Sequence, residues 1–193
     1  MAQLWIVAGP NGAGKTTLAD RWLAPRIPVV SPDAIAALNG VSPIQAGRAA
    51  VVEQERLLAD GASFALDTTF SGNRELTLMK RAAEAGYKIN VVFLCLDSVA
   101  LCLARIHERI ESGGHAVPAE DVARRFTRSL ENLSAAFDLA DRVFVLDNTG
   151  EKRRLLLSVD NHRVKHLSRN LPQWAKEVIP EQMIHSRDND RGR

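Results

Sequence analysis

Short apolar runs alternate along the chain with longer segments in which apolar residues recur every three or four positions. Five of the short runs are almost entirely hydrophobic: residues 4–8, 28–30, 64–67, 90–96 and 142–146. Buried parallel strands have this composition because helices cover both faces of their sheet. Strands that alternate with helices are typical of an α/β protein. We therefore expect a three-layer α/β/α fold around a five-stranded, mainly parallel sheet.

Three long segments carry the start and stop signals of helices. The first begins at a capping box over residues 42–45, with proline at the first helical position, and should end before Gly61. The second follows Ser98 and keeps helical spacing of its apolar residues as far as the glycine pair 113–114. The third begins at Pro118, with two acidic residues in its first turn, where the helix dipole favours them.

The pattern weakens after residue 150. Residues 151–184 predict a hairpin that turns at Asp160 and Asn161, then a short helix over residues 174–179, both as an extension of the same domain. Residues 185–193 have nothing to bury and predict a disordered tail.

Composition narrows the class of protein only slightly. The 193 residues are 46% hydrophobic and 25% charged, as expected of one globular domain, and the net charge of +2 creates no strong field for nucleic acid or membrane. No segment approaches the roughly 20 apolar residues that span a bilayer, so we expect a cytoplasmic protein. Cys95 and Cys102 lie among apolar residues and predict free, buried thiols.

The first apolar run leads into a loop that fits the phosphate-binding pattern G-x-x-x-x-G-K-[ST] at every defined position. Glycines allow a tight bend whose N–H groups face phosphate oxygens, and the next helix adds the positive end of its dipole. A lysine then brings charge to the β- and γ-phosphates, and a threonine hydroxyl can ligate Mg²⁺. The loop predicts binding of ATP with Mg²⁺. The expected contacts are Gly9, Pro10, Asn11, Gly12, Ala13, Gly14, Lys15, Thr16 and Thr17.

Arginines recur in the second and third helices. Arg105 and Arg109 are four residues apart and share one helix face, and Arg124 and Arg125 follow in the next helix. A glycine-containing hinge joins the two helices. This arrangement predicts a lid at about residues 105–128 that closes on phosphate, which the guanidinium fork binds well. Ion pairing with nearby Glu and Asp residues on exposed faces is the alternative.

Two acidic residues follow predicted strands. Asp33 could accept a proton from an acceptor hydroxyl or orient it, although an Asp in a helix's first turn is also favoured by the dipole alone. Asp67 ends the strand at residues 64–67 and could reach Mg²⁺ directly or through water. Asp97 and Asp147 also end apolar strands, so position alone does not distinguish Asp67.

The segments GPNGAGKTT, SPD, DTTFSG, GGHAVPAEDVARRFTRSLENL and FVLDNTG, in this order, resemble the zeta toxin-like group of P-loop kinases over residues 1 to about 150. The resemblance implies a phosphotransferase core with a lid. It also implies transfer of the γ-phosphate of ATP to a hydroxyl of a small molecule, such as the UDP-N-acetylglucosamine that the best-known members phosphorylate. An antitoxin protein is the partner that it suggests.

The resemblance also implies roles by position. Lys15 is the phosphate lysine, Asp33 is the catalytic base, and Arg109 is the first lid arginine. Both Arg124 and Arg125 remain candidates for the second lid arginine. Asp67 falls where the toxins usually carry a substrate-side Glu, which leaves its role between Mg²⁺ and substrate. An ATPase switch module and a kinase of RNA or polynucleotide ends are the competing functions.

Overall fold

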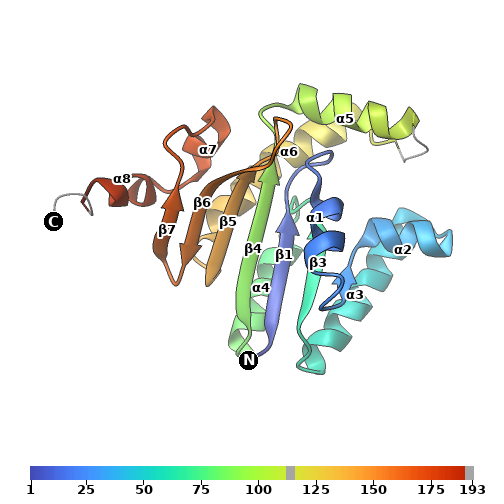
Figure 1. The fold of residues 1–193 in the computed structure, drawn as a ribbon. Coiled ribbons are helices and arrows are strands. Elements are labelled where there is room, and N and C mark those ends of the chain that lie inside the picture. The colour runs from blue at the N-terminus through green and yellow to red at the C-terminus, as the bar shows by residue number, and fades with distance from the viewer. Residues whose placement is uncertain (112–115, 190–193) are drawn as a thin grey trace.

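The computed structural model describes residues 1–111 and 116–189, and it places one mixed sheet between helices (Figure 1). The strands are β1 (Gln3–Ala8), β2 (Val29–Val30), β3 (Phe64–Thr68), β4 (Lys88–Cys95), β5 (Arg142–Asp147), β6 (Arg154–Asp160) and β7 (Arg163–Leu167). The helices are α1 (Lys15–Trp22), α2 (Pro32–Asn39), α3 (Pro43–Ala59), α4 (Arg74–Glu84), α5 (Val99–Glu111), α6 (Ala119–Ala136), α7 (Gln173–Val178) and α8 (Glu181–Asn189).

The sheet has the order β2-β3-β1-β4-β5-β6-β7. Its first five strands are the five that the sequence predicts, and they pair in parallel. The expected number of strands was too small, because the predicted hairpin of β6 and β7 adds two antiparallel strands beside β5. The connection from β5 to β6 is short, which allows only an antiparallel return. Apolar residues of β6, such as Leu157, then continue the core.

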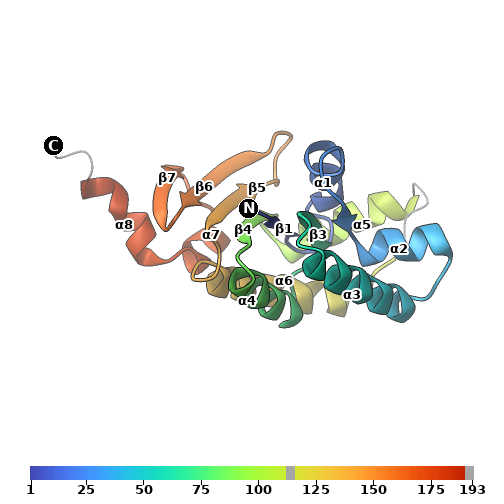
Figure 2. The ribbon, with the colours of Figure 1, turned by 90° about the horizontal axis from the view of Figure 1, so that it is seen from below.

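Helices cover the parallel strands on two faces, and each face has its own apolar core (Figure 2). Helices α3, α4, α6 and α7 pack on one face, and α1 and α5 pack on the other. Along β1, Ile6 belongs to the first core and its neighbour Val7 to the second. Successive side chains of a strand point to opposite faces, which explains why the buried strands are apolar at nearly every position.

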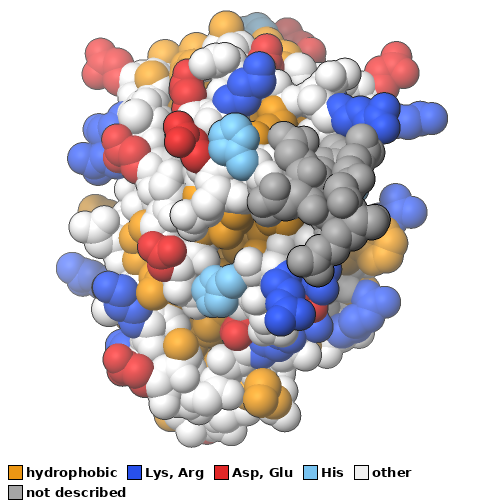
Figure 3. Space-filling view, turned by 90° about the vertical axis from the view of Figure 1, so that its left-hand side faces the viewer, with side chains coloured by type: hydrophobic (Ala, Val, Ile, Leu, Met, Phe, Trp, Pro, Cys, Tyr) orange, Lys and Arg blue, Asp and Glu red, His pale blue; other side chains and the backbone are white. Residues whose placement is uncertain are grey.

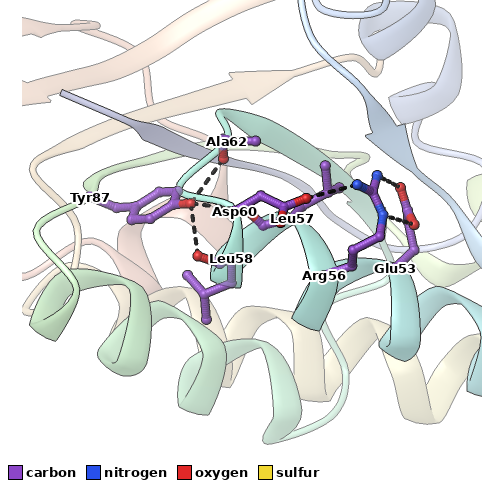
Figure 4. Close-up of polar contacts among 7 residues, drawn as sticks. All are labelled: Glu53, Arg56, Leu57, Leu58, Asp60, Ala62 and Tyr87. Carbon is purple, nitrogen blue, oxygen red and sulfur yellow. Dashed lines mark hydrogen bonds and ion pairs between the residues drawn. The ribbon is translucent and has the colours of Figure 1, made fainter.

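The capping signals of α3 are confirmed at both ends. Ser42 Oγ accepts a 3.3 Å hydrogen bond from the Gln45 N–H, and Gln45 Oε1 accepts one of 3.0 Å from the Ser42 N–H. Gly61 has φ 62° just after the helix. The hydroxyl of Tyr87 lies 3.0–3.4 Å from the carbonyls of Leu57, Leu58 and Ala62 (Figure 4). Tyr87, directly before β4, thus donates its one hydroxyl proton among the carbonyls at the C-terminal end of α3.

The C-terminal segment forms a hairpin and two short helices. The hairpin turns at Asn161 and His162, with φ 48° and 59°, and α8 extends to Asn189. Met183, at the start of α8, packs in the core, and the helix continues beyond it. Residues 190–193 of the expected tail lie outside the described residues, as do residues 112–115 of the predicted hinge at 112–118.

Two surface properties bear on the class of protein. No helix in the described part of the chain is long and apolar enough to cross a membrane. On the side of the C-terminal hairpin, Lys and Arg side chains stand among Asp and Glu side chains (Figure 3).

Both cysteines are free and buried, as predicted, and burial raises the pKa of the Cys102 thiol to about 11.

Candidate active site

The glycine-rich loop forms a tight bend between β1 and α1. Gly9, Gly12 and Gly14 have φ values of 137°, 80° and 88°, which L side chains rarely adopt. The space is also closed at the first of them, where a Cβ atom would lie 1.9 Å from the Leu94 carbonyl oxygen of β4. Gly14 precedes the first residue of α1, so the N–H groups of the loop lie at the N-terminal end of that helix, where the helix dipole is positive.

Lys15 is buried at the first position of α1, with 9% of its surface exposed. Its ammonium donates a 3.0 Å hydrogen bond to the Pro10 carbonyl across the loop. Burial lowers the pKa of Lys15, while the negative charges of Asp67 and Asp33 oppose that effect. Lys15 also lines a cavity over the loop. A buried cation that is hydrogen-bonded to a neutral carbonyl is suited to an anionic ligand such as a phosphate, because the ligand would supply negative charge.

Asp67 meets Thr16 beside the lysine. Thr16 Oγ1 donates a 2.6 Å hydrogen bond to Asp67 Oδ2. Burial raises the pKa of Asp67, while Lys15 and the bond from Thr16 act in the opposite direction. A hydroxyl and a carboxylate oxygen side by side suit Mg²⁺, which is usually held by few protein ligands together with phosphates and water. Within the described ranges, no group of three or more His, Cys, Asp or Glu residues could hold a metal.

The other two acidic residues at strand ends are engaged elsewhere. Asp147 accepts hydrogen bonds from Arg154 at 3.0 Å and from the Thr149 N–H at 2.9 Å. Asp97 is exposed, and its N–H donates to the hydroxyl of the same Thr149. The tertiary structure thus brings Asp67, but neither of these residues, to the hydroxyl of the phosphate loop.

Two cavities meet over the phosphate loop. The first, of about 210 Å³, is lined by the loop, Asp67, Arg105 and Arg109. The second, of about 550 Å³, lies between the start of α2 and the start of α6. Asn11, Asp33 and Arg109 line both cavities. Asp33 is exposed in the first turn of α2, after the N-cap Ser31, so its carboxylate faces a space that a second ligand could enter.

The structure separates the predicted arginines. Arg109 lines both cavities, and Arg125 lines the larger one, with Nη1 3.5 Å from Asn11 Oδ1. Arg124 forms a 2.6 Å ion pair with Asp121 and lines neither cavity, and Arg125 lies 3.9 Å from the same carboxylate. Arg105 lines the smaller cavity, but its Nη2 donates a 2.7 Å hydrogen bond to the Asn148 carbonyl.

Two residues at the site have no counterpart among the sequence-based candidates. Asn148 follows β5 and donates from Nδ2 to the Ala13 carbonyl at 2.8 Å. Thr68 follows Asp67, lines the smaller cavity and donates a 2.6 Å hydrogen bond to Glu75 in the first turn of α4. The position of each residue at a strand end was the available signal, but that signal is shared by many residues of an α/β protein.

The strand order β2-β3-β1-β4-β5 and a phosphate loop after the central strand β1 define a P-loop kinase-like domain. The chain belongs to the AAA_33 family, described as an AAA domain, whose model matches residues 4–133. An uncharacterized protein of Haemophilus influenzae is 31% identical over an alignment of 134 residues that covers 63% of this chain and 95% of that protein.

Solved structures share this fold. The AvrRxo1-ORF1:-ORF2 complex with ATP has a TM-score of 0.71 at 17% identity, over 94% of this chain. This chain spans only 64% of that AvrRxo1 chain. The PezAT toxin–antitoxin system of Streptococcus pneumoniae has a TM-score of 0.62 at 12% identity, over 98% of this chain and 85% of that chain. The Pnkp1/Rnl/Hen1 RNA repair complex has a TM-score of 0.58 at 21% identity, over 72% of this chain and 47% of that chain.

Proposed function

We propose that the protein is an ATP- and Mg²⁺-dependent kinase that transfers the γ-phosphate to a hydroxyl of a small molecule. The junction of the two cavities carries this proposal. Asp33 and Arg109 line both the cavity over the phosphate loop and the larger cavity beside it. An acceptor in the larger cavity would therefore approach the phosphates past a carboxylate and a guanidinium, which are the two groups that such a transfer needs.

In this proposal, the cationic and N–H groups of the site bind phosphate, and its carboxylate and hydroxyl groups bind the metal. The loop N–H groups and Lys15 would hold the β- and γ-phosphates. Thr16 and Asp67 would hold Mg²⁺, which neutralises phosphate charge when it is bound. Arg109 would stabilise charge that develops on the transferring phosphoryl group, with Arg125 as the second arginine from the opposite helix.

Transfer of the γ-phosphoryl group requires one group that accepts the proton of the acceptor hydroxyl. The acceptor oxygen forms a bond to the γ-phosphorus, and the bond from that phosphorus to the β,γ-bridging oxygen breaks. The electron pair of the broken bond leaves on ADP. The proton of the acceptor hydroxyl passes to the carboxylate of Asp33, which is exposed to the larger cavity.

The zeta toxin-like resemblance suggests a particular acceptor and a particular partner. UDP-N-acetylglucosamine is the first acceptor to test, and an antitoxin protein is the first partner. The similarity of fold to the PezAT toxin–antitoxin system supports testing the antitoxin partner.

The deciding experiment measures release of ADP from Mg²⁺–ATP with a panel of acceptors, beside a reaction without acceptor. We expect turnover that depends on a small-molecule hydroxyl. Asp33→Asn should keep Mg²⁺–ATP affinity within about twofold and lower transfer by ~10²-fold or more. Acceptor-independent hydrolysis would favour an ATPase switch, and turnover only with RNA 5′-hydroxyl ends would favour an end kinase. Either result would contradict the proposal.

A further inference from the structure

Asn148 connects segments that lie far apart in the sequence. Its side chain donates to the Ala13 carbonyl of the phosphate loop at 2.8 Å, across 135 residues of chain. Its backbone N–H donates to the Cys95 carbonyl at the end of β4 at 2.9 Å. Its own carbonyl accepts a 2.7 Å hydrogen bond from Arg105 of α5. The residue is thus held by β4 and α5 while its amide reaches the loop.

The contact with the loop is close as well as polar. A Cβ atom on Gly14 would lie 2.8 Å from Asn148 Nδ2. On the other side of the loop, a Cβ atom on Gly12 would lie 2.9 Å from the carbonyl oxygen of Cys102 in α5. The loop is therefore enclosed between α5 and the turn after β5. Any change in Asn148 is transmitted to a backbone that has little room to move.

The hydrogen bond acts on one particular peptide group. The Ala13 carbonyl and the Gly14 N–H belong to the same planar trans peptide, in which the C=O and N–H bonds point in opposite directions. Asn148 holds the carbonyl on the outer side of the loop. The Gly14 N–H is then directed to the inner side, where the smaller cavity is lined by Gly14, Lys15 and Thr16.

We propose that Asn148 is a positioning residue for phosphate binding, because it fixes the Ala13–Gly14 peptide with its N–H directed at the phosphates. Arg105 supports this function by holding the Asn148 main chain. The inference rests on the proposed binding of ATP at this loop. It assigns Asn148 to the phosphates and not to the nucleobase, and it does not depend on the identity of the acceptor.

The test compares the binding of Mg²⁺–ATP and of inorganic tripolyphosphate, which has no base, by calorimetry. Asn148→Ala should weaken both ligands by about 3–10-fold, the net effect of losing one hydrogen bond. Asn148→Asp should weaken both further, since a carboxylate oxygen would face the Ala13 carbonyl. Should Asn148→Ala fail to fold, Asn148→Ser, whose hydroxyl is too short to reach that carbonyl, takes its place under the same criteria.

Asn132→Ala is the matched control. Its amide also donates to two backbone carbonyls, those of Phe70 and Gly72, at 2.9 and 2.8 Å. We expect Asn132→Ala to lose at least as much thermal stability as Asn148→Ala, but weaker phosphate binding only in the latter. Unchanged tripolyphosphate affinity in Asn148→Ala would overturn the inference, whether or not ATP affinity falls. Failure of the wild-type protein to bind ATP would instead defeat the proposed function itself.

Discussion

Thr16 and Asp67, which are 51 residues apart in the chain, are joined by a hydrogen bond of 2.6 Å between the hydroxyl of α1 and the carboxylate of β3. Parallel pairing of β3 with β1 places Asp67 beside Val7, just before the phosphate loop. The carboxyl ends of neighbouring parallel strands meet at one edge of the sheet, where ligands of such folds bind.

Acid should weaken Mg²⁺-dependent binding of ATP at a higher pH than for an ordinary Asp. Burial raises the pKa of Asp67 above its usual 3.8, so protonation removes the ligand as the pH falls through that raised value. Calorimetry from about pH 7.5 to 4.5 measures the effect. ATP itself also gains a proton in this range. Asp67→Asn is therefore the reference: it should bind Mg²⁺–ATP weakly, and its pH dependence should reflect only the protonation of ATP. Identical pH profiles for the two proteins would refute the assignment of Asp67.

Lys15→Met should separate ATP binding from stability. We expect ATP affinity to fall by about 10–100-fold, because charge-assisted hydrogen bonds are lost. The folded chain holds the Lys15 proton less tightly than the unfolded chain, so the charge costs stability below the lowered pKa, and the cost disappears as the pH rises toward 10.5. The melting temperature at neutral pH should therefore equal or exceed that of the wild type. Lys80→Met, at an exposed position of α4, should leave ATP affinity unchanged.

Arg125→Ala and Arg124→Ala form a matched pair on one helix. Removal of Arg125, which lines the larger cavity and lies 3.5 Å from Asn11, should lower turnover by ~10-fold or more. Removal of Arg124 should change turnover less than about twofold, since its side chain is 56% exposed and lines neither cavity. Steady-state kinetics with saturating ATP decide the matter. The reverse order of effects would make Arg124 the second lid arginine.

Gly9→Ala should destabilise the protein by about 2–5 kcal/mol, because its φ of 137° and its 1.9 Å Cβ approach to the Leu94 carbonyl leave no room for a methyl group. Gly47→Ala is the control within α3, where no heavy atom lies within 4 Å of the added Cβ. It should stabilise by about 0.5–1 kcal/mol, since alanine favours helix. Denaturant unfolding measures both variants. Equal effects would mean that Gly9 has space that the structure does not show.

Local physics made much of the fold predictable. The phosphate loop depends on residues that are adjacent in the chain, and Lys15 begins α1 directly after it. The capping box at Ser42 and the glycine stop at Gly61 are also local, and both ends of α3 were correct. Helix α4 was missed because its start, Arg74–Glu75, lies in a stretch that resembles a loop, and its buried stripe of Leu78, Met79 and Ala82 is short.

The site depended on contacts between distant segments, which no local pattern reports. Three Asp residues lie at or just after the carboxyl ends of apolar strands, and only the order of the strands decides that Asp67 meets Thr16. Arg105 and Arg109 share a helix face, yet packing directs Arg105 to the Asn148 carbonyl. The sequence by itself determined the phosphate loop and the parallel strands, because both follow from neighbouring residues. The tertiary structure alone decided which carboxylates and arginines surround that loop, because strand order and helix packing bring together residues that are distant in the chain.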